Sequence, residues 1–292
     1  MKYVANSSTP EVFYSFFLPI ISIAWKKMGY EPLSLLFGDE ALWRADPLTS
    51  FVYDAAARHS RIHFTSPVQN FKNATVSQIA RFFPAAISGF KEDDYFIAGE
   101  ADMIPLDPVF CNKQDMKYKA HILEADYYGQ TLEKEEIPRR FRGCYVGATY
   151  EAWRKILEIT TFDLSLEIQK ALFMGRDHWN NDEYYLTHMI GRSSLFSGPL
   201  ERIDESSFRK GEFQLFMRKR ANVVCVRRLD RRSWRFNGET DLIDCHSVRP
   251  AYENKKVEVL LKMLSVYFPE SFDIFKAYIQ DFRDLKAKLS HE

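Results

Sequence analysis

The sequence predicts an α/β fold, with a mostly parallel sheet flanked by helices and an elaborated second half. Across residues 1–110, short apolar runs alternate with longer amphipathic stretches, which is the pattern of successive strand–helix units. Beyond residue 110 the alternation loosens. The chain has 292 residues, of which 46% are hydrophobic, so it can bury a large core. We find no internal repeat or low-complexity linker, and we expect one domain over 1–292.

Local signals bound the expected elements. Pro10 lies near the start of the first helix, where its missing N–H costs little, and Gly29 is a natural stop. Pro269 separates two terminal helices. The expected strands cover residues 3–6, 33–37, 61–65, 95–98, 142–148 and 223–228. The expected helices cover residues 10–28, 47–58, 76–90, 149–158, 164–174, 181–191, 254–267 and 272–289, with an irregular stretch over 234–244.

Charge gives no reason to expect a nucleic acid or an anionic membrane as partner, because 40 basic residues balance 40 acidic ones. The cysteines form no C-x-x-C pair, so neither a zinc site nor a disulfide framework is indicated. A reducing compartment is the simpler inference. The apolar run 12–25 is too short to span a bilayer, and no secretory signal is apparent. We therefore expect a soluble, cytoplasmic protein without a membrane anchor.

Two carboxylates follow the buried run 95–98 at a spacing of two residues. In an extended chain, side chains at i and i+2 point the same way, so Glu100 and Asp102 should project together from the end of a strand. Converging carboxylates there can bind a hard divalent cation and, through it, phosphate oxygens. An E-x-D is also common in solvated loops, and taken alone that interpretation is favoured.

Two further groups of residues are compatible with the same chemistry. Gln78 and Arg81 share one helix face, and a guanidinium there suits phosphate oxygens, although a surface arginine with a buried stem is the commoner case. Asp244 and His246 are again at i and i+2. Histidine with carboxylate is a common ligand set for Mn²⁺, whereas a single histidine is more often structural. Arg249 and Pro250 follow His246 closely.

A third group surrounds the start of the helix expected at 181. Asn181 can cap this helix, and Asp182 and Glu183 favour its positive end, which is an adequate structural explanation. The functional alternative makes one of the two carboxylates a general base near a bound sugar, with Trp179 as an apolar platform.

Together these motifs resemble a nucleotide-sugar glycosyltransferase of the GT-A fold, which is Rossmann-like. The resemblance is strongest to the small soluble transferases of large DNA viruses of algae, and it covers most of the chain. It rests on the segments Tyr3–Ser7, Ser77–Arg81, Asp94–Leu106, Cys144–Ala148 before Trp153, Trp179–Glu183 and Asp244–Pro250.

The resemblance implies a metal-dependent transfer of a hexose or pentose from a nucleoside-diphosphate donor, a UDP-sugar above all, to a hydroxyl of a glycan acceptor. Glu100-Ala101-Asp102 stands where the family has D-x-D, which holds Mn²⁺ (or Mg²⁺) and the sugar nucleotide. The metal role falls mainly on Asp102, with Glu in place of the first Asp, and His246 completes the metal ligands. Such an enzyme would act in the cytoplasm, for example in a virus-infected cell.

The resemblance also assigns the remaining site residues. Ala5, Asn6 and Ser7 would hold the nucleoside. Gln78 belongs to the donor side with Arg81, which would face the diphosphate and donor sugar. Asp182 or Glu183 would be the base, and Glu183 is the weakly favoured of the two. Residues 1–110 would form the nucleotide-sugar half, 111–250 the acceptor half and 251–292 the terminal helices.

Two other functions stay open from the sequence. Residues 217–235 carry eight basic side chains and only one acidic one, Asp230, so this stretch could bind nucleic-acid phosphates, or it could be a solvated strand pair or a wall of the diphosphate pocket. With zero net charge and no nucleic-acid motif, we expect no nucleic-acid partner. A metal-dependent hydrolase of nucleotide sugars, with water as acceptor, would use the same frame.

Overall fold

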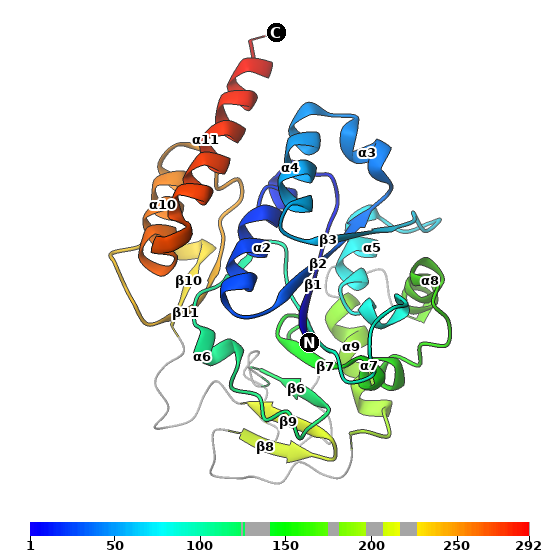
Figure 1. Cartoon of the computed structure of the whole chain (residues 1–292). Coiled ribbons are helices and arrows are strands. Elements are labelled where there is room, and N and C mark those ends of the chain that lie inside the picture. Colours follow the sequence, from blue (N-terminus) through cyan, green and yellow to red (C-terminus); the bar gives the residue numbers. More distant parts are fainter. Residues whose placement is uncertain (124, 126–140, 175–180, 197–206, 217–226, 292) are drawn as a thin grey trace. The chain divides into compact units, whose positions relative to one another are not determined.

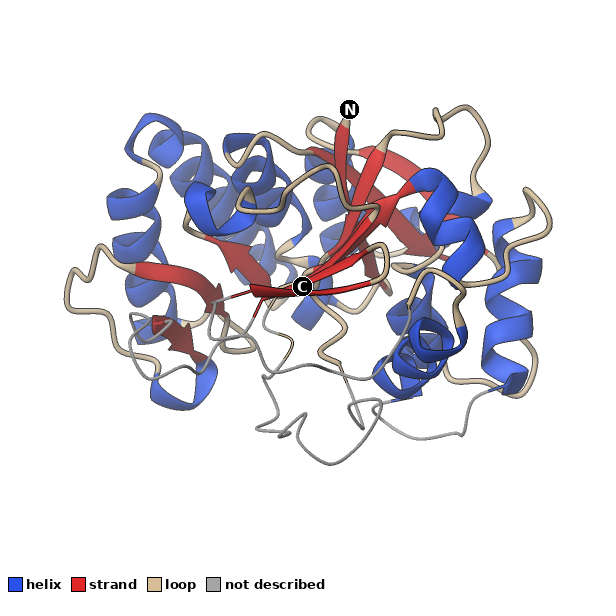
Figure 2. Ribbon diagram, turned by 90° about the horizontal axis from the view of Figure 1, so that it is seen from below, coloured by secondary structure: helices blue, strands red, loops and turns tan. Residues whose placement is uncertain are grey.

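The structure is a computed structural model, and it describes residues 1–123, 125, 141–174, 181–196, 207–216 and 227–291. Strands and helices both occur throughout (Figures 1 and 2), which confirms the α/β class. The chain folds into two compact units. Unit 1 comprises Met1–Ser7, Thr65–Glu100 and Lys113–Cys225, and unit 2 comprises Ser8–Phe64, Ala101–Asn112 and Val226–Glu292. A single catalytic domain over 1–292 stays a prediction.

The strands of unit 1 pair in both directions. Their order is β1 (Lys2–Ser8), β4 (Tyr95–Ala98), β7 (Val146–Thr149), β6 (Ala120–Ile122), β9 (Phe213–Phe216) and β8 (Ser207–Lys210). β1 and β4 are parallel, with Ala5 opposite Ala98, and β6 and β9 are also parallel. β7 is antiparallel to β4 and β6, and β8 to β9. Because β1 and β4 run the same way, the residues after Ala5 and after Ala98 emerge at one edge of the sheet.

The helices of unit 1 are α5 (Asn73–Ala80), α7 (Tyr150–Ile156), α8 (Leu164–Met174) and α9 (Asn181–Arg192), with a 3₁₀ turn at Pro84–Ala86. The core of this unit is aromatic. Trp153 of α7 stacks on Phe82 with ring centroids 6.4 Å apart, and its indole N–H donates to the carbonyl of Phe96 at 3.0 Å. This contact fixes α7 against the strand that leads to Glu100.

Unit 2 holds the second, three-stranded sheet, in the order β10 (Arg227–Asp230), β11 (Leu242–His246) and β5 (Met103–Pro105). Its other elements are α1 (Val12–Ser15), α2 (Leu18–Lys27), β2 (Glu31–Phe37), α3 (Glu40–Arg44), α4 (Pro47–Ala57), β3 (Arg61–Thr65, ending in unit 1), α6 (Pro108–Cys111), α10 (Asn254–Tyr267) and α11 (Phe272–Leu289), with 3₁₀ turns at Arg231–Ser233 and Pro269–Ser271. α10 and α11 lie side by side (Figure 1). Tyr278 of α11 donates its hydroxyl to the carbonyl of Phe16, so α11 is tied to the start of the unit.

Several expected bounds were wrong. The first helix is two helices, α1 and α2, because Pro19 is tolerated only in the first turn of a helix and a new helix starts just before it. The helix expected at 76–90 covers 73–80, and Pro84 opens a separate 3₁₀ turn. The strand expected at 142–148 starts at Val146, after Tyr145 at a left-handed φ of 63°. The irregular stretch 234–244 contains the start of β11, and β5 was not expected at all.

Candidate metal and donor site

The edge where β1 and β4 end in unit 1 places the expected nucleoside residues. Ala5, Asn6 and Ser7 are all buried on β1, and the hydroxyl of Ser7 donates to the carbonyl of Ser77. Both polar atoms of the Asn6 amide are buried without a hydrogen-bond partner among the described residues. A Cβ on Gly99 would lie 2.0 Å from Asn6 Oδ1, so only glycine leaves room for this amide.

Arg81 follows α5 directly and is buried among carboxylates of the same unit. Its Nη2 lies 2.6 Å from Asp182 Oδ2, and its Nη1 lies 3.3 Å from Glu100 Oε1. Nη1 also donates to the carbonyl of Gly99 at 3.2 Å. Burial alone would lower the pKa of Arg81, but the charges of Asp182 and Glu100 outweigh that effect and raise it. The half-buried Gln78 lies one turn earlier on α5.

The two candidate bases begin α9, and both are buried. Asp182 Oδ2 accepts a hydrogen bond from Arg81 Nη2 at 2.6 Å. Glu183 instead accepts a hydrogen bond from the backbone N–H of Gly143 at 3.3 Å. The adjacent side chains therefore have different partners, as expected for neighbouring positions on a helix.

Asp102 lies in unit 2 and faces an imidazole and a guanidinium. His246 Nε2 is 3.4 Å and Arg249 Nε is 3.2 Å from Asp102 Oδ2. Burial would raise the pKa of Asp102, but the hydrogen bond from His246 and the charges of Arg249 and Arg231 lower it overall. Asp102 is thus ionised at neutral pH, as a metal ligand must be.

Strand register brings Asp102 and His246 together. β11 runs antiparallel to β5, and its last residue, His246, is opposite Met103, the residue after Asp102. The backbone N–H of Ser247 donates to the carbonyl of Asp102 at 2.9 Å and extends this pairing. A histidine far along the chain therefore reaches the carboxylate through a backbone ladder.

In unit 2, Asp102 and His246 offer a carboxylate and an imidazole as possible metal ligands, with His246 Nε2 3.4 Å from Asp102 Oδ2. Glu100 precedes Asp102 by two residues, ends a segment of unit 1 and offers a second carboxylate. Only the half-buried Ala101 separates the two carboxylates in the chain. Two carboxylates and an imidazole are a suitable donor set for Mn²⁺ and an acceptable one for Mg²⁺. The residues present therefore fit a divalent ion.

Sequence reasoning missed two arginines of unit 2 as partners of predicted site residues. Arg249 contacts Asp102, and its guanidinium lies 4.3 Å from the ring centroid of Tyr14. Arg228 forms a buried ion pair with Asp244. The carboxylate of Asp244 is therefore bound to a guanidinium, and no metal role is needed to explain its burial. The arginine-rich stretch 217–235 was the sequence signal that could have indicated Arg228 as a partner. Residues 217–226 of this stretch lie outside the described residues, and so does Trp179.

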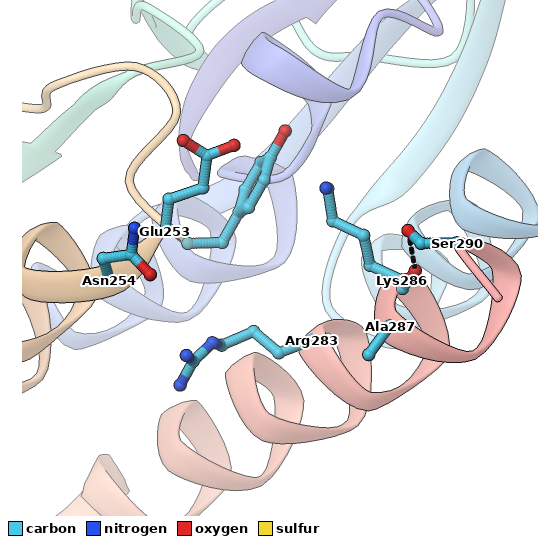
Figure 3. A pocket seen from close by; sticks show the side chains of 7 residues that line it. Glu253, Asn254, Arg283, Lys286, Ala287 and Ser290 are labelled. Carbon is cyan, nitrogen blue, oxygen red and sulfur yellow. Dashed lines mark hydrogen bonds between the residues drawn. The ribbon is translucent and has the colours of Figure 1, made fainter.

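A small cavity of unit 2 is lined by none of the predicted site residues. In Figure 3, Glu253 and Asn254 at the start of α10 lie across from Arg283 and Lys286 of α11. The hydroxyl of Ser290 donates to the carbonyl of Lys286 at 2.8 Å, which the dashed line marks.

In the part of the chain that the structure describes, we find no helix with the length and apolarity needed to cross a membrane.

Neither a known protein family nor a curated protein sequence matches the chain. Among solved structures, it is similar to the galactosyltransferase LgtC in complex with donor and acceptor sugar analogs, at 10% identity and a TM-score of 0.46, covering 91% of this chain and 96% of that one. It is also similar to the apo form of the glycosyltransferase GlyE of Streptococcus pneumoniae, at 9% identity and a TM-score of 0.45, covering 95% and 64%.

A third similar structure is the mannosyltransferase PcManGT from Pyrobaculum calidifontis in complex with GDP-Man and Mn²⁺, at 12% identity and a TM-score of 0.35, covering 76% of this chain and 58% of that one. At these identities and TM-scores the likenesses carry no functional argument. The function is therefore inferred from the chain's own residues.

Proposed function

We propose that the protein is a metal-dependent glycosyltransferase that moves a sugar from a nucleoside-diphosphate donor to a hydroxyl of a glycan acceptor. The observation that carries this proposal is the 3.4 Å contact of Asp102 with His246, with the carboxylate of Glu100 two residues earlier in the chain. A divalent ion held by these residues would neutralise the charge that develops on the diphosphate as the glycosidic bond breaks. UDP-sugars are the first donors to test, and GDP-sugars the second.

The donor side of the proposal uses the edge where β1 and β4 end. The unpartnered amide of Asn6 offers one acceptor and two donors, which suits a nucleobase or a ribose hydroxyl. Burial without a partner costs free energy that such a ligand would recover. Ala5 and Ser7 would flank the nucleoside. Gln78 and Ala101 would also belong to the donor-binding residues.

The acceptor side uses α9. Glu183 is bonded to a neutral backbone N–H, whereas Asp182 is bonded to a guanidinium. Burial raises the pKa of Asp182 in spite of the neighbouring guanidinium, but its carboxylate is held by Arg81 at 2.6 Å and is less able to turn towards an acceptor. Glu183 would therefore be the general base for the acceptor hydroxyl if the reaction inverts, and Asp182 would accept a hydroxyl of the donor sugar.

Nucleic-acid binding has less support. Of the basic stretch, Arg228 is buried against Asp244 and not available to phosphates, whereas Arg232 and Arg235 are exposed. Salt-sensitive retention on a polyanion resin, unchanged by a nucleotide sugar with Mn²⁺, would favour nucleic acid instead.

Calorimetry of the full chain with UDP and with GDP tests the proposal. We expect binding in Mn²⁺ that is lost or greatly weakened by a chelator, because the diphosphate reaches the carboxylates only through a cation. Equal affinity in both conditions would remove the metal from the mechanism. A thermal-shift panel of nucleotide sugars with Mn²⁺ then selects the donor, since a ligand of the folded state raises the melting temperature. With candidate acceptors, a transferase forms a glycoside, whereas a hydrolase releases only free sugar.

A further inference from the structure

The two terminal nitrogens of the Arg81 guanidinium contact the protein's own groups, whereas its buried Nε has no hydrogen-bond partner among the described residues. The guanidinium bridges Asp182 and Glu100 and also bonds the carbonyl of Gly99. The side chain is only 7% exposed. A planar guanidinium with several fixed N–H directions can orient two carboxylates at once, which a lysine ammonium cannot do in the same way.

The surroundings of Arg81 leave it little freedom. A Cβ on Gly143 would lie 2.4 Å from Arg81 Nη2, so the absence of a side chain at this position makes room for the guanidinium. On another side, the ring centroid of Phe82 is 5.0 Å from the guanidinium carbon. Gly143 also donates its N–H to Glu183, so one backbone segment borders both Arg81 and the second carboxylate of α9.

We infer that Arg81 is a positioning residue that orients Asp182 and Glu100, and that it does not contact the phosphates of the donor. This differs from the role that the family resemblance implies for Arg81, and it rests on the proposed function, in which these carboxylates serve the donor sugar and the metal. Removing the guanidinium leaves Asp182 buried without its cation, and its carboxylate then turns away or takes up a proton. The nucleotide still binds, but the sugar is no longer held for reaction.

An unfolding cycle tests whether Arg81 holds Asp182. Urea unfolding is measured for Arg81→Met, Asp182→Asn and the double variant, with Arg154→Met as the matched control, because Arg154 bonds the carbonyl of Ala85 instead of a carboxylate. We expect the double variant to be more stable than the two single effects predict, by at least tenfold in the unfolding constant. Additive effects would overturn the inference.

A second measurement separates positioning from phosphate binding. Calorimetry with Mn²⁺ and UDP or GDP is repeated on Arg81→Lys and on Gly143→Ala, in which the added methyl displaces the guanidinium. We expect nucleotide affinity within threefold of the unsubstituted protein. For the nucleotide sugar that the unsubstituted protein turns over fastest, kcat should fall at least 100-fold, and KM should rise no more than it does in Asp182→Asn. A tenfold loss of UDP or GDP affinity in Arg81→Lys would overturn the inference and make Arg81 a phosphate ligand.

The two measurements distinguish this inference from the proposed function. If the unsubstituted protein binds neither UDP nor GDP with Mn²⁺, the proposed function is wrong, and the unfolding cycle alone decides whether Arg81 holds Asp182. If the nucleotide binds and the cycle is additive, the function stands and the positioning role is wrong. Should Arg81→Met not fold, Arg81→Gln replaces it in the cycle.

Discussion

Acid is expected to destabilise the protein through His121, a fully buried residue of β6. Its Nε2–H donates to the carbonyl of Asp115 at 2.9 Å, and its Nδ1 has no hydrogen-bond partner among the described residues. The ring contacts Tyr95 edge to face, with centroids 5.5 Å apart. A proton added to Nδ1 would therefore be buried without an acceptor, which is why burial lowers the pKa of His121 from 6.5 to about 4.

The pKa values give the sign and size of this effect. Because the folded pKa lies below the unfolded one, the unfolded chain takes up the proton first, and stability falls as the pH drops from about 6.5 towards 4. The full difference corresponds to about 3 kcal/mol, of which about 2 kcal/mol is already lost at pH 5. Above the unfolded pKa the loss disappears.

Urea unfolding at pH 7.5 and pH 5 measures this loss for the unsubstituted protein and for His121→Gln. Gln keeps a donor for the carbonyl of Asp115 but does not titrate. We expect the fall in unfolding free energy between the two pH values to be about 2 kcal/mol smaller in His121→Gln. His188, which is exposed on α9, provides the matched control as His188→Gln. The same fall in all three proteins would refute this reasoning.

Four substitutions test the site itself. Asp102→Asn should abolish transfer and Mn²⁺-dependent nucleotide binding while the far-ultraviolet circular dichroism is unchanged, and normal turnover would show that Asp102 is not the main ligand. Glu183→Gln should remove most of kcat with near-normal donor binding, whereas Asp182→Asn should weaken donor binding; the reverse pattern would exchange their roles. Gly99→Ala brings a methyl 2.0 Å from Asn6 Oδ1, so thermal unfolding should show a loss of about 1–3 kcal/mol in the free energy of unfolding. Nucleotide binding should weaken as well. An unchanged Tm would contradict the close approach.

Much of the fold was accessible from local patterns. β4, α8, α10 and α11 have the expected bounds, because each is an apolar run or an amphipathic stretch with clear signals at its ends. β5 was missed because three residues are too few to show a period. β11 lies in a stretch of sequence without apolar–polar alternation. It forms a strand because it pairs with β5 and β10.

The candidate site shows the same division between local and long-range information. The E-x-D spacing predicted that Glu100 and Asp102 would project together, and this stays a prediction. The contact of Arg81 with Asp182, 101 residues later, depends on how α5 and α9 pack and on the missing side chain at Gly143. Arg249 was passed over because an arginine before a proline has no local feature that reveals its partner.

The buried cysteines allow local opening of the protein to be measured through the alkylation of their thiols. Cys111, Cys144 and Cys245 are buried thiols, and burial also raises the pKa of the Cys245 thiol. A thiol reagent reaches such groups only through transient opening, so their alkylation rates measure how often each segment separates from its neighbours. Cys144 reports on unit 1, and Cys111 and Cys245 report on unit 2. Slower alkylation of Cys245 in Mn²⁺ would show that the strand carrying His246 opens less often when the cation is bound.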